Sequence, residues 1–133
     1  MSVTQFDLLS DRNHLIAVVG ATDSPGKYGG IIYRDLRSRG HRVVAVNPKR
    51  QTVAGDPCHP NLTSLPERPD IVNLVVPSDI GAQVVDEWAG LGGERVWFQP
   101  GSYDDRLLDQ AQEAGMDVVA GDCIMVLSRR LAS

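Results

Sequence analysis

The sequence is poor in aromatic residues and cysteines and carries no excess of positive charge, and each shortage excludes a class of protein. Phe, Trp and Tyr make up only 5% of its 133 residues. The core must therefore consist of Val, Ile, Leu and Ala, which suits a parallel sheet covered on both faces. The net charge is -4, whereas nucleic-acid binders need a broad basic surface, so we expect no nucleic-acid partner. The two cysteines, Cys58 and Cys123, do not make a disulfide framework and indicate a reducing, cytoplasmic location.

Long apolar runs and metal-binding motifs are also missing. No apolar run approaches the length that spans a bilayer, and residues 1–13 are too polar for a signal peptide, so we expect no membrane partner. There is no C-x-x-C or H-E-x-x-H spacing, and the scattered His14, His41 and His59 are predicted to be surface residues. We therefore predict no metal site and no catalytic residues, which favours a binding protein over an enzyme. The length predicts one domain over residues 1–133 and leaves the oligomeric state open.

Short β-branched runs alternate with helical stretches, which is typical of repeated βαβ units. The predicted strands are residues 15–19, 43–46, 71–76, 96–98 and 118–120. The predicted helices are residues 28–39, ended by Gly40; 80–89, capped by Ser78 or Asp79; 103–115, capped by Ser102 and ended by Gly115; and 124–131. Residues 51–69 hold four prolines and are predicted to be mostly loop, with room for a short edge strand or a turn of helix.

These elements predict an α/β doubly wound, three-layer fold with a mainly parallel five-stranded sheet in the order 3-2-1-4-5. Ligands of such sheets bind at the carboxyl ends of the strands, where the strand order changes direction. That rule selects four loops, at residues 20–30, 47–50, 77–79 and 99–102.

The first loop, residues 20–30, has the composition of a phosphate-binding turn. Its glycines allow a sharp turn and a close approach of backbone to ligand, and a helix begins near Tyr28 with its amides free. Thr22, Ser24 and Lys27 add donors for a pyrophosphate. A simple strand-to-helix turn of small residues is the alternative, since the glycines match neither G-x-G-x-x-G nor a Walker motif.

The second loop, Asn47-Pro48-Lys49-Arg50, places two cations where NAD-binding sheets usually carry an acidic residue. Two cations suit a phosphorylated ribose, and a solvated basic turn fits the residues equally well.

The remaining loops offer fewer polar groups. Val76-Pro77-Ser78 could pack against a nucleotide or form a plain strand exit with a helix cap. In Gln99-Pro100-Gly101 the amide of Gln99 offers directional hydrogen bonds. Cys123, after the fifth strand, could meet a ligand thiol or merely pack.

Taken in order, these segments resemble the CoA-binding protein family, the small stand-alone relatives of the CoA-binding domain of succinyl-CoA synthetase α subunits. The resemblance extends from about Leu15 to Val126. It is carried by residues 19–22, Pro25, residues 27–29, 46–48, 70–72, 76–78, 96–101 and 121–125.

The resemblance implies a Rossmann-like fold that binds coenzyme A, with no phosphorylated histidine or nucleotide-hydrolysing machinery in this domain. It implies that Gly20, Ala21, Thr22, Ser24, Pro25 and Lys27, with Tyr28 beside them, hold the diphosphate. It places Asn47, Pro48, Lys49 and Arg50 near the 3′-phosphate, Val76, Pro77 and Ser78 beside the nucleotide, and Gln99, Pro100 and Gly101 near the pantetheine arm.

Three functions remain open from the sequence. The first is a non-catalytic binder or sensor of CoA or an acyl-CoA. The second is an NAD(P)-binding oxidoreductase or subunit, in which Lys49 and Arg50 would accept an NADP 2′-phosphate. The third is a protein-interaction module that kept the fold and lost its ligand.

Overall fold

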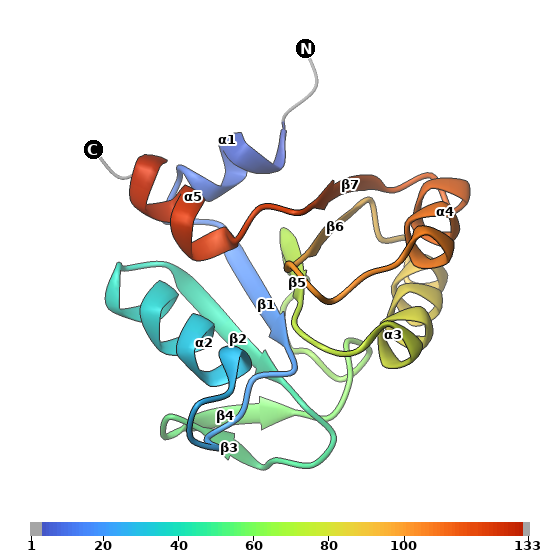
Figure 1. The fold of residues 1–133 in the computed structure, drawn as a ribbon. Helices are drawn as coiled ribbons and strands as arrows, with labels where there is room; N and C mark the ends of the chain where they lie inside the picture. Colours follow the sequence, from blue (N-terminus) through green and yellow to red (C-terminus); the bar gives the residue numbers. More distant parts are fainter. Residues whose placement is uncertain (1–3, 132–133) are drawn as a thin grey trace.

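A seven-stranded, mostly parallel sheet forms the centre of the fold in the computed structural model, which describes residues 4–131 (Figure 1). The elements in chain order are α1 (Gln5–Leu9), β1 (Leu15–Val19), α2 (Tyr28–Ser38), β2 (Arg42–Val46), β3 (Thr52–Val53), β4 (Asp56–His59), β5 (Ile71–Leu74), α3 (Ser78–Gly90), β6 (Arg95–Phe98), α4 (Asp105–Glu113), β7 (Asp117–Ala120) and α5 (Ile124–Leu131). The predicted α/β doubly wound, Rossmann-like class is confirmed.

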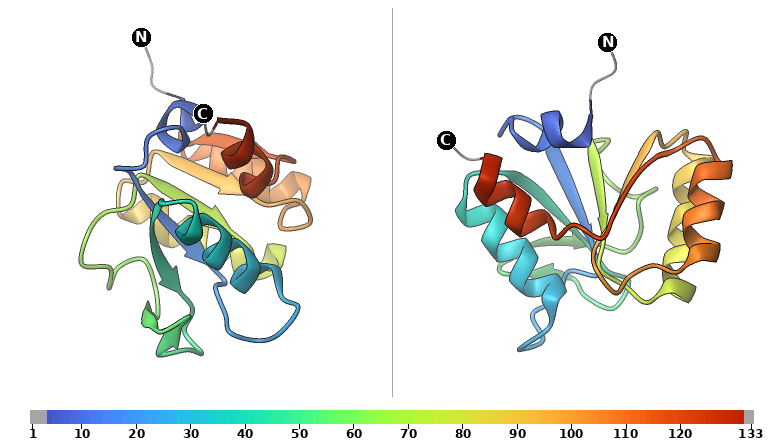
Figure 2. Two further views of the ribbon diagram at one scale, coloured as in Figure 1. Left: turned by 90° about the vertical axis from the view of Figure 1, so that its left-hand side faces the viewer. Right: turned by 45° about the horizontal axis from the view of Figure 1, so that its top comes forward.

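Helices cover both faces of the sheet, and each face has its own apolar core. Helices α2 and α5 lie on one face, and α3 and α4 lie on the other (Figures 1 and 2). Strand β1 shows why, because its successive side chains point to opposite faces. Ile16 and Val18 belong to the core beneath α2 and α5, and Ala17 and Val19 belong to the core beneath α3 and α4.

The strand order corrects the prediction. The observed order is β3-β4-β2-β1-β5-β6-β7, so the sheet has seven strands rather than five. The run at residues 71–76, predicted to lie outside the second strand, forms β5 at residues 71–74 and pairs in parallel with β1 on its other side. The place beside β2 is taken by β4, which pairs with it through Ala45–Cys58 and Val46–His59.

The proline-rich segment, predicted to be mostly loop with room for a short edge strand, contains two short strands. Strands β3 and β4 form an antiparallel hairpin whose turn, Ala54-Gly55, has positive φ angles at both residues (53° and 82°). Such a turn suits the twist of a two-residue hairpin. Pro57 is tolerated because β2 pairs only with Cys58 and His59 of β4, so the missing N–H of Pro57 removes no bond to β2. The short edge strand that the prediction allowed for in this segment is therefore present, as a hairpin of two strands, and the rest of the segment has no helix or strand.

Helix ends were predicted better than helix starts. Gly40 and Gly115, with φ of 88° and 82°, follow the ends of α2 and α4 as expected. The start of α4 is capped by Asp104, not Ser102, because the Asp104 carboxylate accepts the Leu107 N–H at 2.8 Å. Helix α3 includes Ser78 as its first residue, so Ser78 is not its cap.

Two features at the amino ends of the strands were missed. Thr4 and Asp7 form a capping box that starts α1, a short helix with no apolar periodicity in the sequence. His41 is buried rather than exposed, and its Nε2 lies 2.8 Å from Ser128 Oγ of α5.

Over residues 4–131, the structure contains no helix with both the length and the apolar character that crossing a bilayer requires.

Candidate functional site

A cleft of about 1310 Å³ opens at the carboxyl ends of the central strands. It lies where the chain order changes direction, because β1 is followed on one side by β2 and on the other by β5. Side chains from the loops after β1, β2, β5 and β6 line it, together with the first turns of α2 and α3. A cleft of this size can hold an extended, cofactor-sized molecule.

The loop between β1 and α2 packs so closely that only glycine fits at Gly20, Gly29 and Gly30. A Cβ on Gly30 would collide with the Thr22 carbonyl oxygen. Gly20 has a φ of 102°, and a Cβ there would collide with the carbonyl oxygen of Val75. A Cβ on Gly29, in the first turn of α2, would collide with the carbonyl oxygen of Gly20. The glycines therefore bring the start of α2 directly against the tip of β1, so that its backbone faces the cleft.

Two helix N-termini border the cleft without side-chain caps. The N-cap residues are Lys27 for α2 and Pro77 for α3, and neither helix has a side-chain cap hydrogen bond. Both N-cap residues line the cleft. The first amides of a helix and its dipole favour a bound anion, and Lys27 adds a full positive charge beside one of them.

The loop after β2 is tied to the loop after β1 by hydrogen bonds. Asn47 Nδ2 donates to the Ala21 carbonyl at 3.0 Å, and Asn47 Oδ1 accepts the Lys49 N–H at 2.9 Å. The guanidinium of Arg50 donates to Ser24 Oγ at 2.6 Å. These contacts join the two loops into one wall, from which the exposed Lys49 reaches the cleft.

The side of the cleft formed by α3 is mostly apolar. Val76 lies at the exit of β5, and Ile80 and Val84 follow at helical spacing on α3. Leu62 completes this wall from the segment after β4. Ile80 remains 42% exposed, an unusual amount for an isoleucine, and so offers apolar surface to a ligand.

A buried amide network closes the end of the cleft next to β6 and α5. The Gln99 side chain is almost fully buried, and its Oε1 accepts hydrogen bonds from Asn73 Nδ2 at 3.1 Å and from Ile124 N at 2.9 Å. Because both acceptor positions are used, the amide orientation is fixed, and Nε2 donates to Cys123 Sγ at 3.3 Å. Gln99 thus holds the half-buried Cys123 thiol at the cleft surface.

The two cysteines have different surroundings. Cys58 is buried, and burial is the main cause that raises the pKa of its thiol; its Sγ lies 3.7 Å from the Asn47 carbonyl oxygen. Cys58 therefore acts as a packing residue beside β2, and only Cys123 is placed to meet a ligand.

One carboxylate, Glu87, lines the cleft. Its oxygens accept hydrogen bonds from Leu62 N at 3.3 Å, Thr63 N at 3.1 Å and Thr63 Oγ1 at 2.7 Å. These bonds anchor the segment after β4 to α3, so the carboxylate has a structural task.

Most of the predicted site residues come together in the cleft. Those that line it are Gly20, Thr22, Ser24, Lys27, Tyr28, Asn47, Pro48, Lys49, Val76, Pro77, Gln99, Pro100, Gly101 and Cys123. Ala21, Pro25, Arg50 and Ser78 are not brought to its surface. Ala21 is fully buried within the loop after β1, and the guanidinium of Arg50 donates its hydrogen bond to Ser24.

Sequence reasoning missed the part of the wall contributed by α3 and the segment after β4. These residues are Pro60, Asn61, Leu62, Ile80, Gln83, Val84 and Glu87. The spacing of Ile80, Gln83, Val84 and Glu87 along one helical face was a signal that could have found the α3 members. Nothing in the sequence pattern marked residues 60–62, because the position of an edge strand within residues 51–69 was not predicted.

Comparison with known proteins gives a consistent result. A protein-family model described as a CoA binding domain matches residues 14–129. The chain is 27% identical, over 128 residues, to an ADP-forming acetate–CoA ligase of Archaeoglobus fulgidus, covering 89% of this chain and 19% of the ligase. It is 26% identical, over 115 residues, to the uncharacterized protein YneT of Bacillus subtilis, covering 86% of this chain and 85% of that protein.

A solved structure has the same fold as this chain. A conserved hypothetical protein from Pyrococcus furiosus superposes with a TM-score of 0.82 at 39% identity, covering 85% of this chain and 97% of that chain. The present chain spans about a fifth of the length of the Archaeoglobus ligase. The ligase similarity therefore concerns this region of the enzyme only.

Proposed function

This chain belongs to the family of CoA-binding domains, and we propose that its cleft binds coenzyme A or an acyl-CoA as a non-catalytic binder or sensor. The observation that carries the proposal is the pair of uncapped helix N-termini, at Lys27 and Pro77, on opposite sides of one cleft. Backbone amides left free at such positions favour phosphate oxygens.

The distribution of charge along the cleft gives the ligand a direction. Lys27 and Lys49 lie on the loops after β1 and β2, which suits the diphosphate and the 3′-phosphate of the ligand. The opposite end, at Gln99–Ser102 and Cys123, has no charged side chain and suits the uncharged pantetheine arm. The apolar wall of Val76, Ile80, Val84 and Leu62 offers a surface for the adenine ring.

A binding role fits the ionisable groups of the cleft better than catalysis. No histidine is among the described residues that line it, and its carboxylate, Glu87, is engaged with Leu62 and Thr63. A general base needs a group free to accept the proton of a substrate. The predicted single domain over residues 1–133 and the cytoplasmic location stay predictions.

The two alternatives differ from this proposal in what the cleft would do. An interaction module without a ligand would have filled the cleft with side chains, and the open volume of about 1310 Å³ argues against this. An NADP-binding protein would use Lys49 for the 2′-phosphate, so NADP belongs in the test.

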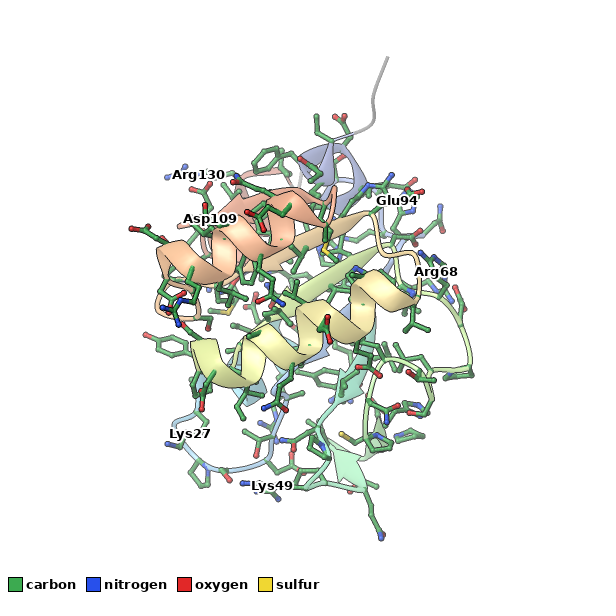
Figure 3. The ribbon with its side chains drawn as sticks, turned by 90° about the vertical axis from the view of Figure 1, so that its right-hand side faces the viewer. Lys27, Lys49, Arg68, Glu94, Asp109 and Arg130 are labelled. Carbon is green, nitrogen blue, oxygen red and sulfur yellow. The ribbon has the colours of Figure 1, made fainter. Side chains whose placement is uncertain are left out.

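The test is isothermal titration of protein freed of ligand with CoA, dephospho-CoA, NAD and NADP. We expect saturable CoA binding and about tenfold weaker binding of dephospho-CoA, because one exposed charged contact is lost. Lys27→Ala should weaken CoA binding, while Arg130→Ala, which removes the same charge from the far end of the molecule, should leave it unchanged (Figure 3). Absence of CoA binding, or a preference for NADP, would overturn the proposal.

A further inference from the structure

The neighbouring cations Lys49 and Arg50 do not occupy equivalent positions. Lys49 is exposed and lines the cleft, and Figure 3 shows it at the same end of the molecule as Lys27. Arg50 is partly buried, does not line the cleft, and donates from its guanidinium to Ser24 Oγ at 2.6 Å. A short, charge-assisted hydrogen bond of this kind is among the stronger contacts between side chains.

The Ser24 hydroxyl has a second donor beside it. Thr22 Oγ1 accepts the Ser24 N–H at 3.1 Å and donates to Ser24 Oγ at 3.3 Å. A serine hydroxyl can accept two hydrogen bonds and donate one. With Arg50 and Thr22 on its two lone pairs, Ser24 keeps only its own proton, and its side chain lines the cleft.

A hydroxyl in this arrangement is a fixed donor. It cannot rotate to accept a hydrogen bond from a ligand without giving up Arg50 or Thr22. The positive guanidinium also polarises the hydroxyl, which makes its proton a better partner for an anion.

We propose that Arg50 is a positioning residue that acts through Ser24, fixing the Ser24 hydroxyl as a hydrogen-bond donor to the diphosphate of the bound ligand. Lys49, by contrast, contacts the phosphate monoester on the ribose. This division of labour rests on the proposed function, and it separates two residues that the sequence had placed together at the ribose phosphate.

The experiment compares Arg50→Ala, Ser24→Ala, the double variant and Lys49→Ala, with Arg130→Ala as the charge-matched control. Each is titrated with CoA, dephospho-CoA, NADP and ADP. ADP carries the diphosphate without the ribose phosphate, dephospho-CoA lacks only that phosphate, and NADP carries it on the 2′ oxygen.

We expect Arg50→Ala to weaken CoA and dephospho-CoA by the same factor, about tenfold, because both ligands keep the diphosphate. Ser24→Ala should weaken both by at least as much, and the double variant should be no weaker than Ser24→Ala alone. Lys49→Ala should weaken CoA by about tenfold and leave dephospho-CoA unchanged, which abolishes the discrimination between them. Arg130→Ala should match the wild type.

Three results would overturn the inference. In the first, Arg50→Ala weakens CoA but not dephospho-CoA, which would place the guanidinium on the ribose phosphate. In the second, the losses of Arg50→Ala and Ser24→Ala add in the double variant, which would make the two residues independent. In the third, no nucleotide binds the wild type, and the proposed function then fails as well. If the wild type prefers NADP, and the losses of affinity in Arg50→Ala and Ser24→Ala still do not add in the double variant, then the proposal of CoA binding is wrong but the role of Arg50 in positioning Ser24 stands.

Discussion

The two ends of the sheet differ in whether the hydrogen-bond donors near them have partners within the fold. At the amino ends of the strands, the fully buried Gln5 donates to the carbonyls of Val96 and Asp117, both at 3.0 Å, and Asp70 accepts the Leu15 N–H at 2.9 Å. At the carboxyl ends, α2 and α3 begin without side-chain caps. The difference teaches that the helix starts at the cleft leave donors available at a cost in stability, whereas the donors of Gln5 and Leu15 at the amino ends are used within the fold.

Helix α4 shows that the missing caps are local to the cleft. It also begins at the carboxyl ends of the strands, but its N-cap Asp104 accepts the Leu107 N–H and does not line the cleft.

The largest effect is expected for Gly20→Ala at the cleft end. The new Cβ would require a non-glycine residue at a φ of 102° and would collide with the Val75 carbonyl. We expect a loss of about 4 kcal/mol of unfolding free energy, measured by denaturant titration. Gly26→Ala is the control, because Gly26 also has a positive φ (75°) but no atom within 4 Å of the added Cβ. Its cost should be about 1 kcal/mol, and equal losses in the two variants would refute the steric argument.

The second prediction concerns acid stability and the opposite end of the sheet. Burial, followed by the nearby charges of Arg12 and Arg39, lowers the pKa of His41 from 6.5 to about 4. Between these two values the unfolded chain binds a proton that the folded chain excludes, so this contribution is complete above pH 6.5 and is lost as the pH falls toward 4. We expect a loss of about 2 to 3 kcal/mol over that range.

The variant His41→Gln isolates this effect. It should make the pH dependence of unfolding free energy shallower over the same interval, while CoA affinity at pH 7 stays that of the wild type because His41 lies far from the cleft lining. Parallel pH profiles for the two proteins would count against a buried neutral His41.

The third prediction removes a cap outside the cleft. Asp104→Ala should cost about 1 kcal/mol of unfolding free energy, the usual price of an N-cap side chain. Because Asp104 does not line the cleft, titration with CoA should give the wild-type affinity. If Asp104→Ala weakened CoA binding as much as Lys27→Ala does, the start of α4 would contribute to the ligand site in the same way as the start of α2.

The smallest change in stability is expected when a cap is added at the cleft. Lys27 has the extended φ and ψ (−89°, 135°) of an N-cap residue. Lys27→Asp should therefore stabilise the protein by about 0.5 to 1 kcal/mol while weakening CoA binding by more than tenfold. Lys27→Ser separates the effect of the added cap from the effect of the added negative charge, since serine supplies a cap without a negative charge. Destabilisation by both variants would contradict the view that this helix start is left open at a cost.

The parts of this picture that could be predicted from sequence are those set by local patterns. Apolar runs located β1, β2, β5, β6 and β7, because strands buried on both faces are continuous in Val, Ile and Leu. Glycines located the ends of α2 and α4. The predicted site residues were chosen by the rule that ligands bind at the carboxyl ends of strands, and most of them line the cleft.

The rest depends on contacts between distant segments. Nothing local distinguishes a strand beside β1 from one outside β2, so the position of β5 was wrong. The role of Arg50 could not be seen because its partner, Ser24, lies 26 residues away. The burial of His41 depends in the same way on Ser128 of α5.

The hairpin of β3 and β4 bears on the kinetics of ligand entry. Strand β1 pairs with β2 over five residue pairs, whereas β4 pairs with β2 over only two. Strand β1 is paired on both sides, whereas β4 lies near the edge of the sheet, so the amide proton of Asn47, which donates to the His59 carbonyl at 2.9 Å, should exchange with deuterium well before those of β1. Since Leu62 and Lys49 flank this hairpin and line the cleft, any opening of this edge would change how quickly a nucleotide enters and leaves, independently of how tightly it is held.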